Sequence, residues 1–432
     1  MENSVWQDDV LVIGGGTAGF GAAVAAGRLG LDVCLIEATG KVGGVMAFCP
    51  GMPWGAAFPD DRIIGGILEE LAGRLFAMVP PAAEKRPCAL ENFGPEILYD
   101  HDLATLVMFE MLEEAGVRVH LHTMALAPHM EGRRVAAVDL CDRHGVRRIA
   151  ARMVIDCSGD GDIAARAGVP YTLGDEAGRL MGVTLSFHML GADWARVFAG
   201  GDPYFTRHAA RGIAQGRLHP DLAQLYLMKG FHRDTVFCNS VVIRDVDGTD
   251  AAAVAAATQE GRRRCRQLAG FLRSDVPGFE AARMAFLGPS VGVRETRKLE
   301  GMYRVTGADL AAATKFEDGI VCCDNPIDDV MRGAAMTHAA MVGQGEYYTI
   351  PFRSLVPRGI GNLMFAGRLI CADPVAFASV RGMPQCMAMG QAVGTAAALA
   401  LRRGVAVQDV DRGVLVAALQ EQGVRGLGGV PL

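Results

Sequence analysis

The chain has 432 residues, half of them apolar, so it can bury the cores of two or three domain-sized units. Its formal net charge is −6, which excludes the broad basic field that nucleic acids and anionic membrane surfaces require. We therefore expect no nucleic-acid partner and no membrane partner.

The first ten residues, MENSVWQDDV, lack the basic and then apolar segments of a secretory signal, and no apolar run approaches 18 residues. Eleven cysteines are scattered along the chain without any C-x-x-C pair. This pattern is typical of a reducing compartment and argues against a disulfide framework, a structural zinc or an iron–sulfur cluster. The expectation is a cytoplasmic protein without a metal site.

Residues 8–37 carry the strongest local pattern: an apolar strand, a glycine loop, a small-residue helix and a second strand. In the loop, Gly14 allows a tight turn, Gly16 lets the backbone approach a pyrophosphate, and Gly19 lets the helix pack closely on the strand. The helix N-terminus offers free N–H groups to phosphates, and Glu37 stands where an acid binds a ribose hydroxyl. The sequence therefore predicts a dinucleotide site.

Helices, strands and loops alternate over the next part of the chain. Apolar residues at helical spacing predict helices over 64–78 and 102–114, whereas glycine- and proline-containing stretches predict loops at 48–58 and 80–95. Alternating patterns predict strands at 117–124, 135–140, 146–151 and 153–155, with a hairpin turn at 142–145. After the last of these strands, Asp160 or Asp162 is expected to cap a short helix.

The remaining segments suggest a discontinuous domain. Residues 182–342 have a mixed pattern and read as an inserted domain, after which a strand is expected at 362–366 and a long helix from Pro384. We predict an α/β fold with a Rossmann-like FAD/NAD(P)-binding domain built from residues 1–181 and 343–432. The insertion, 182–342, would be an α+β substrate domain.

Three glycine-bearing segments far apart in the chain indicate an extended ligand. Gly43-Gly44 resembles the second glycine pair of FAD proteins with the glutathione-reductase fold. Cys157-Ser158-Gly159-Asp160 resembles the strand end that passes the FAD diphosphate. Phe365-Ala366-Gly367-Arg368 resembles the C-terminal strand that leads to the flavin, with an arginine where many FAD proteins have an aspartate.

Three longer runs extend this resemblance: VGVRETRKLEGMYRVTGADL at 291–310, YTIPFRSLVPRGIGNLMFAGRLICA at 348–372 and SVRGMPQCMAMGQAVGTAAALA at 379–400. From Asp8 to Leu401 the chain resembles the FAD-dependent oxidoreductase family related to the fumarate reductase and succinate dehydrogenase flavoproteins. The resemblance implies FAD as the cofactor. Since no histidine stands between Val45 and Gly51, where covalent attachment occurs in that group, the FAD is expected to be noncovalent.

The fingerprint and the resemblance together give the expected cofactor contacts. They are Gly14, Gly16, Thr17, Ala18, Gly19, Glu37, Ala38, Gly43, Gly44, Val45, Met124, Ala125, Cys157, Ser158, Gly159, Gly367, Arg368, Gly382, Pro384 and Gln385. Of these, Gly382, Pro384 and Gln385 are expected to contact the flavin. Pro384 at a helix start would aim N–H dipoles at the flavin, where they stabilise negative charge on reduction.

Four side chains are candidates for catalysis. Arg294 and Arg297 have the spacing of one helix face, and Arg381 precedes the expected flavin-facing helix; each could bind a substrate carboxylate as a fork. Their alternative role is a structural salt-bridge network. His188 could act as a general acid or base, or be an ordinary buried histidine. Tyrosines 347 and 348 could donate a proton, or pack in the core.

These features predict an FAD-dependent dehydrogenase or reductase that moves a hydride between flavin N5 and a small organic substrate. A flavin-dependent monooxygenase and an electron-transfer subunit of a larger complex are the alternatives. Neither a second nucleotide fingerprint nor a cysteine cluster supports them. The substrate and the electron acceptor or donor stay open, and a homo-oligomer is compatible with the sequence.

Overall fold

A central seven-stranded sheet organises the computed structural model, which describes residues 6–49, 51–59, 62–88, 93–330, 337–343 and 345–428. The strand order is β5-β2-β1-β8-β7-β6, and β19 also pairs with β8. The parallel strands are β1 (Trp6–Ile13), β2 (Val33–Ile36), β5 (Arg118–His120), β8 (Gly145–Asp156) and β19 (Leu363–Phe365); β6 (Met124–Glu131) and β7 (Arg134–Asp142) are antiparallel.

Successive side chains of β1 point to opposite faces of the sheet and pack into two separate hydrophobic clusters. Val10 and Val12 pack with helices α1 (Thr17–Arg28), α3 (Gly66–Phe76), α4 (His101–Glu114) and α11 (Met383–Arg403). Leu11 and Ile13 face the other layer, formed by β6, β7 and α5 (Asp162–Arg166). A mainly parallel sheet with both faces covered confirms the expected α/β class.

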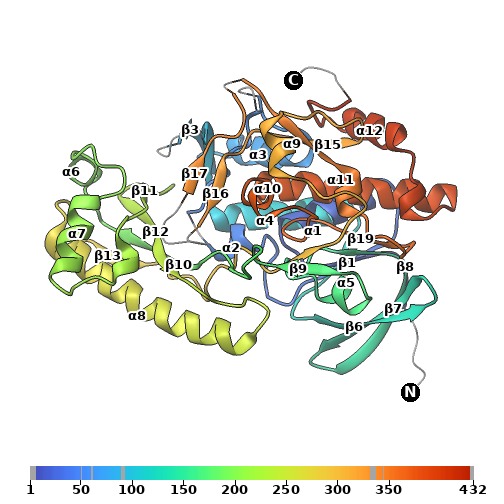
Figure 1. Cartoon of the computed structure of the whole chain (residues 1–432), viewed down its shortest axis with the longest axis horizontal. Coiled ribbons are helices and arrows are strands. Elements are labelled where there is room, and N and C mark those ends of the chain that lie inside the picture. The colour runs from blue at the N-terminus through green and yellow to red at the C-terminus, as the bar shows by residue number, and fades with distance from the viewer. Residues whose placement is uncertain are drawn as a thin grey trace.

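Helices α1 and α11 are in close contact, although they come from opposite ends of the chain (Figure 1). A Cβ added to Gly390 or Gly394 of α11 would overlap the carbonyl oxygen of Ala18 or Ala22 in α1, and one on Gly21 would overlap that of Met387. Glycine at these positions lets the two backbones touch. The N- and C-terminal segments are thereby joined in one unit.

A second sheet lies to one side of the molecule, at the left in Figure 1, in the order β11-β12-β10-β13. Its strands are β10 (Val183–Leu190), β11 (Leu227–Lys229), β12 (Thr235–Ile243) and β13 (Arg283–Ala285). Helix α8 (Ala251–Asp275) covers one face and shares a separate apolar cluster with the sheet. Helices α6 (Trp194–Val197) and α7 (Thr206–Ala214) complete this unit.

Short elements connect the two units and finish the chain. The paired strands are β9 (Tyr171–Leu173) with β14 (Arg297–Leu299), β15 (Gly319–Cys323) with β18 (Tyr348–Pro351), and β16 (Ile327–Asp329) with β17 (Thr337–Ala339). The remaining helices are α2 (Val45–Phe48), α9 (Gly307–Ala311), α10 (Pro374–Val380) and α12 (Arg412–Glu421). The division at residues 182 and 342 stays a proposal.

Several predicted elements are confirmed, among them α3, α4, the start of α11 and the hairpin turn between β7 and β8. Three predictions were wrong. The expected loop at 80–95 contains strand β3 (Ala83–Pro87), which pairs with β4 (Pro95–Tyr99). The expected strand at 117–124 is broken between β5 and β6, and the expected strands at 146–151 and 153–155 are one strand, β8. In each case tertiary pairing decided the boundary.

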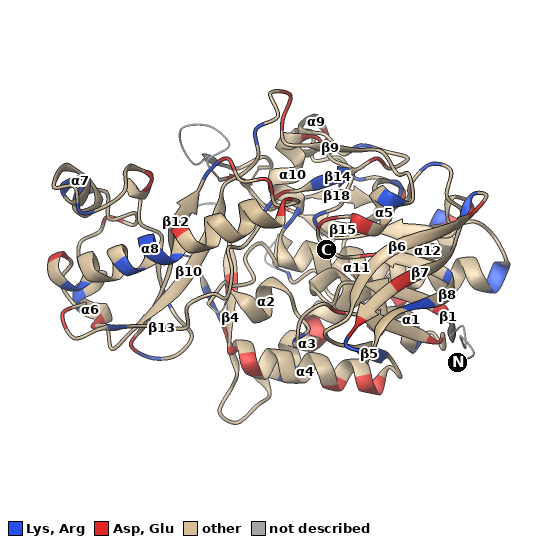
Figure 2. Cartoon of the chain, turned by 90° about the horizontal axis from the view of Figure 1, so that it is seen from below, with Lys and Arg blue, Asp and Glu red and all other residues tan. Residues whose placement is uncertain are grey.

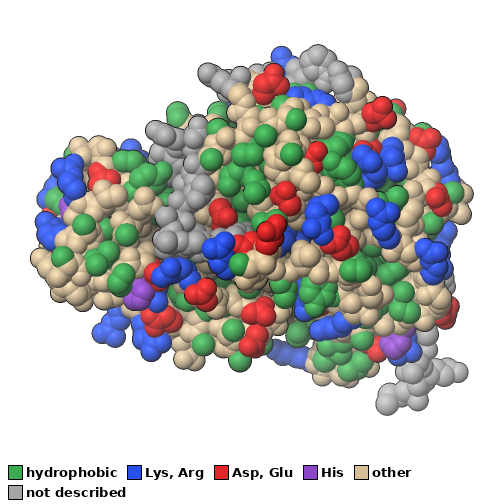
Figure 3. All heavy atoms as spheres, in the orientation of Figure 1, with side chains coloured by type: hydrophobic (Ala, Val, Ile, Leu, Met, Phe, Trp, Pro, Cys, Tyr) green, Lys and Arg blue, Asp and Glu red, His purple; other side chains and the backbone are tan. Residues whose placement is uncertain are grey.

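Charge is distributed over the whole chain. The basic run of α8 includes Arg263 and Arg264, which pair with Glu260, and Arg264 also pairs with Asp221. Basic and acidic positions both occur along α8 and over the rest of the chain (Figure 2). On the face seen in Figure 3, side chains of both signs are interspersed. Within the described residues, no helix is long and apolar enough to span a membrane.

Candidate functional site

The glycine loop after β1 has the geometry expected of a phosphate-binding turn. Gly14 has φ +93°, and a Cβ there would meet the backbone at Cys157. A Cβ on Gly19 would overlap the carbonyl oxygen of Gly14, so this glycine keeps α1 close to the strand. By contrast, a Cβ on Gly16 would meet nothing within 4 Å. The space beside Gly16 is therefore free for a ligand.

The N-terminus of α1 opens toward the same space. The helix begins at Thr17, followed by Ala18, and its N-cap residue Gly16 makes no side-chain cap. The first N–H groups of the helix consequently have no side-chain acceptor from the N-cap and can bind an anion.

Glu37 is held firmly at the end of β2. One carboxylate oxygen accepts the N–H of Gly15 at 2.8 Å, and the other accepts the N–H and hydroxyl of Thr39, each at 2.7 Å. Ala38 lies between these two acceptor contacts. The carbonyl oxygen of Glu37 accepts the N–H of Thr123, which places Met124 and Ala125 of β6 just beyond this corner. Four predicted cofactor contacts, Glu37, Ala38, Met124 and Ala125, thus come together.

Gly43 and Gly44 lie directly against the first glycine loop. Gly43 donates its N–H to the carbonyl oxygen of Gly15 at 2.7 Å and forms a bridge with Gly16. Both residues have positive φ, and Gly44 is the N-cap of α2, whose first residue is the partly exposed Val45.

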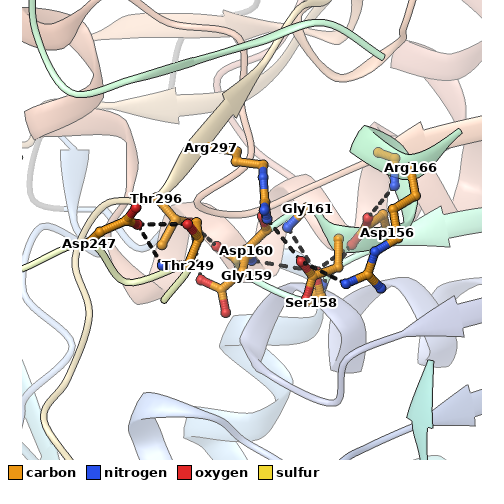
Figure 4. A network of polar contacts seen from close by, with 12 residues as sticks. Asp156, Ser158, Gly159, Asp160, Gly161, Arg166, Asp247, Thr249, Thr296 and Arg297 are labelled. Carbon is orange, nitrogen blue, oxygen red and sulfur yellow. Dashed lines mark hydrogen bonds and ion pairs between the residues drawn. The ribbon is translucent and has the colours of Figure 1, made fainter. Parts of the chain in front are cut away.

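The loop after β8 is organised by a residue that the sequence reasoning did not select. Asp156 accepts the N–H and the hydroxyl of Ser158 with one oxygen and the N–H of Ala164 with the other (Figure 4). Burial raises the pKa of this carboxyl group, partly offset by these hydrogen bonds. The N-cap of α5 is Gly161, so the prediction that Asp160 or Asp162 caps this helix was wrong.

Residues from the C-terminal strand reach the same loop. A Cβ on Gly159 would overlap the guanidinium of Arg368, which also lies 3.5 Å from Asp160, while Cys157 and Gly367 are close to α1. Arg368 Nη1 is buried and has no hydrogen-bond partner within the described residues. An ordered anion or polar ligand atom would satisfy it.

Helix α11 begins as predicted. Gly382 is its N-cap without a side-chain cap, Pro384 stands in the first turn, and Gln385 is fully buried. The amide nitrogen of Gln385 donates to the carbonyl oxygen of Ala56 at 2.8 Å, whereas its oxygen has no partner among the described residues. The free space at Gly16, the uncapped helix starts and these orphaned polar atoms fit an extended dinucleotide.

The inserted sheet turns a polar face toward the cofactor domain. Thr184, Ser186 and His188 alternate along β10 with the apolar residues that pack on α8, and all three are buried. The hydroxyl of Ser186 is 3.0 Å from the Cys49 thiol, in the segment after α2. The ring of His188 contacts Phe237 and Phe286. This face therefore meets the segment that follows Gly44.

Arg294 joins this face, but it does not lie on a helix as the spacing suggested. Its guanidinium donates to the hydroxyl of Thr184 at 2.6 Å and to the carbonyl oxygen of Gly182. Burial, helped by the nearby charge of Arg381, lowers the pKa of Arg294 to about 10, while Asp328 partly opposes the shift. Two guanidiniums are thus close together with Asp328 beside them.

Arg381 comes to this place from the residue just before α11. It donates to the Asp328 carboxylate at 2.8 Å and to its carbonyl oxygen at 2.6 Å. Its Nε is buried without a hydrogen-bond partner within the described part of the chain. The arginine is therefore held by one acid and still has a donor to offer.

Arg297 is not part of this group. It begins β14 instead of continuing a helix, and its guanidinium donates to the carbonyl oxygen of Asp160 and to the carboxylate of Asp162 (Figure 4). It also stacks on Tyr171. The structure thus separates Arg297, beside the strand-end loop, from Arg294 and Arg381.

Residues missed by the sequence reasoning also gather here. Trp54 and Tyr99 are stacked with ring centroids 4.5 Å apart, and Cys49 is close enough to both Tyr99 and Arg294 to influence the pKa of each. None of these residues belongs to a local motif.

The two tyrosines considered as proton donors have other contacts. The hydroxyl of Tyr348 is hydrogen-bonded to Ser379 and Cys323, and Lys315 lies over the ring of Tyr347.

Comparisons with known proteins agree with this geometry. The model of the family described as "FAD dependent oxidoreductase" matches residues 9–422. Digeranylgeranylglycerophospholipid reductase of Picrophilus torridus is 32% identical over 165 residues, which cover 35% of this chain and 39% of the relative. The corresponding protein of Thermoplasma acidophilum is 30% identical over 159 residues, with the same coverage. The chain thus spans about two fifths of the length of these curated relatives.

Solved structures share the fold. Anhydrotetracycline hydroxylase OxyS of Streptomyces rimosus has a TM-score of 0.52 at 12% identity, covering 92% of this chain and 63% of the other. The p-nitrophenol 4-monooxygenase PnpA of Pseudomonas putida DLL-E4 has a TM-score of 0.50 at 12% identity, covering 97% and 88%. At this identity the similarity shows the fold alone.

Proposed function

Because the chain belongs to the FAD dependent oxidoreductase family, which makes it an enzyme with FAD as its cofactor, we propose that it is a dehydrogenase or reductase of a small organic anion. The observation that carries the proposal is the proximity of two arginines: Arg294 donates to Gly182, and the N–H of Gly182 bonds to Val330, two residues after the Asp328 that holds Arg381. Two forked cations beside one acid favour a bound carboxylate or another delocalised anion.

Bound FAD supplies hydride exchange at N5. The chain's own residues do the rest: Gly16 and the start of α1 hold the diphosphate, and Glu37 holds the ribose. The start of α11 directs N–H groups toward developing negative charge. Arg294 and Arg381 orient the substrate anion, and His188, buried on the same strand face as Thr184, is placed to hold or release a proton.

The fumarate reductase relationship and the hydride-transfer chemistry belong to this proposal. Named relatives include reductases, whereas structural neighbours include a hydroxylase and a monooxygenase. The two alternative functions are a monooxygenase and an electron-transfer subunit of a larger complex. The stopped-flow experiment described next tests them together with the proposed function. Location in the cytoplasm, assembly as a homo-oligomer, and the absence of nucleic-acid or membrane partners also stay proposals.

Flavin absorbance in anaerobic stopped flow tests this function. The purified FAD-loaded protein is mixed with a panel of organic acids, with NADH or NADPH, and with reduced dye. An acid that bleaches the oxidised flavin without a nicotinamide nucleotide supports a dehydrogenase. A dye-reduced flavin reoxidised by an unsaturated or oxo acid supports a reductase. Reduction by NADPH followed by oxygen consumption and hydroxylated product would overturn the proposal in favour of a monooxygenase.

Arginine-to-lysine variants test whether the rate of flavin reduction depends on Arg294 and Arg381. Lysine keeps the charge but cannot reproduce the fork, so Arg294→Lys and Arg381→Lys should slow flavin reduction by about 100-fold, or about 3 kcal/mol. Arg297→Lys is the comparison, because its partners are Asp160 and Asp162. It should lower stability or FAD retention and leave the rate per folded, FAD-loaded molecule near normal. Wild-type rates in all three variants would place the substrate elsewhere.

A further inference from the structure

Two buried polar atoms near the arginine pair have no hydrogen bond within the described residues. They are Nε1 of Trp54 and the hydroxyl of Tyr99. Trp54 is fully buried and Tyr99 is 4% exposed, so bulk water does not cover these side chains. An unpaired buried donor costs about 1–3 kcal/mol, and such groups in a native fold call for a physical explanation.

The two side chains are held in place by the backbone around them. Trp54 exchanges both backbone hydrogen bonds with Ile97 of β4, at 2.9 and 3.1 Å. Tyr99 is the last residue of the same strand, and its ring stacks on the indole at an interplanar angle of 28°. The indole N–H is also close enough to the hydroxyl to oppose part of the pKa increase that burial causes. The two orphaned atoms are therefore neighbours.

Cys49 connects this aromatic pair with the proposed anion site. Its thiol contacts Ser186 at 3.0 Å, two residues along β10 from the Thr184 that accepts a hydrogen bond from Arg294, and its charge also acts on the pKa of Tyr99. Burial raises the pKa of Tyr99, so its hydroxyl keeps its proton near neutral pH. The arrangement offers two neutral donors beside two cationic ones.

We propose that Trp54 Nε1 and Tyr99 Oη bind one oxygen atom of the substrate, separate from the anionic group bound by Arg294 and Arg381. This inference rests on the proposed function. It narrows the substrate class to organic acids with a second oxygen acceptor, such as oxo acids. A neutral donor pair suits a carbonyl oxygen, which accepts two hydrogen bonds without bringing a second charge into a buried site.

Matched pairs of acids test the proposal by equilibrium binding. The FAD-loaded protein is titrated without oxygen with phenylpyruvate and 3-phenylpropionate, and with pyruvate and propionate, and Kd is read from the perturbed flavin spectrum. The wild-type protein should bind each oxo acid at least about tenfold more tightly than its partner acid, as expected for hydrogen bonds that the partner cannot make. Tyr99→Phe and Trp54→Phe should each reduce this ratio toward one.

The melting temperature distinguishes a substrate-binding hydroxyl from a hydroxyl that stabilises the fold. The hydroxyl of Tyr303 donates to Asp309 at 2.9 Å, so Tyr303→Phe loses a real hydrogen bond and serves as the control. That variant should melt at a lower temperature and keep the wild-type binding ratio. Tyr99→Phe should melt close to the wild-type temperature, because the hydroxyl has no partner at hydrogen-bond geometry among the described residues.

The outcomes separate failure of this inference from failure of the proposed function. Equal binding of both acids, unaffected by Tyr99→Phe, would overturn the donor pair and leave the anion site standing. No binding of any of the four acids would overturn both. A third outcome is that Tyr99→Phe changes the flavin spectrum in the absence of any acid and leaves the Kd ratio unchanged. This result would show that the donors face the cofactor, and it would also overturn the proposed donor pair.

Discussion

The individual glycines of the loop after β1 are required for different physical reasons. Gly19 is required by protein packing, because a side chain would overlap the carbonyl oxygen of Gly14. Gly16 has an extended backbone, with φ −67° and ψ −173°, and open space beside it. No packing contact with the described residues requires glycine there, and we propose that the FAD diphosphate is what requires it.

This difference predicts separable effects. Gly16→Val should leave the unfolding free energy of the FAD-free protein within about 0.5 kcal/mol of wild type. It should raise the Kd for FAD by at least about 100-fold, or about 2.7 kcal/mol, because the side chain fills the diphosphate space. Gly19→Ala should destabilise the FAD-free protein itself. Urea unfolding and FAD titration measure the two quantities, and wild-type FAD affinity in folded Gly16→Val would contradict the assignment.

Among the secondary-structure elements, helices α1 and α11 are in direct contact, and this contact joins the two ends of the chain in one domain. Gly394 is close to Ala22 because neither helix places a side chain between the backbones. Gly394→Ala should therefore force the helices apart and cost about 1–3 kcal/mol of stability. Gly270 is the control: it is an exposed glycine inside α8 with nothing within 4 Å of an added Cβ.

Gly270→Ala should increase stability by about 0.5–1 kcal/mol, since alanine favours the helix and meets no obstacle. Urea denaturation of both variants measures the contrast. A Gly394→Ala protein as stable as wild type would show that the helix contact is not tight.

Three helices are also tied by charges at the surface. Glu70 of α3 accepts hydrogen bonds from Arg28 of α1 at 2.6 and 2.8 Å, and Arg74 links it to Glu114 of α4. The contacts with Arg28 and then Arg74 hold the pKa of Glu70 below its ordinary value of 4.5. A carboxyl group whose pKa is depressed by folding stabilises the protein above its unfolded pKa.

That stability should be lost as pH falls below about 4.5 and through the depressed pKa of Glu70. Glu70→Gln should cost no more than about 1 kcal/mol at pH 7, because the pair is partly exposed. The difference from wild type should shrink toward zero near pH 3. Urea unfolding at the two pH values checks this. Glu110→Gln, at an exposed residue of α4 with no ion pair among the described residues, should show no such trend.

At the scale of the whole molecule, the predicted FAD contacts come from both ends of the chain, and we expect the FAD to be held without a covalent bond. No histidine stands between Val45 and Gly51, and the nearby Cys49 thiol contacts Ser186 and has a pKa raised by burial, so it is a poor nucleophile. Acid precipitation should therefore release intact FAD into the supernatant, measured by chromatography. A yellow pellet would contradict noncovalent binding.

Free FAD should also stabilise the fold. A ligand that binds only the native state adds about 2.7 kcal/mol at 100 times its Kd. The melting temperature should rise with FAD concentration in wild type and stay constant in Gly16→Val, which serves as the internal control.

The geometry of the glycine loop was predictable from sequence. Phosphate binding needs glycines and a helix start within a few residues of one another, so the pattern is local and survives as a motif in Gly14, Gly16 and Gly19. The same holds for the α/β class and for the helix beginning at Pro384, because backbone propensity and periodicity act over short distances.

The grouping of the candidate substrate residues was decided by tertiary structure. Arg294 and Arg297 have helical spacing, yet β14 pairs with β9 and separates them, while Arg381 arrives from a distant segment. Trp54 and Tyr99 become neighbours only because the segment after α2 pairs with β4. No local pattern marks such residues, because their roles depend on how the inserted sheet is docked against the cofactor domain.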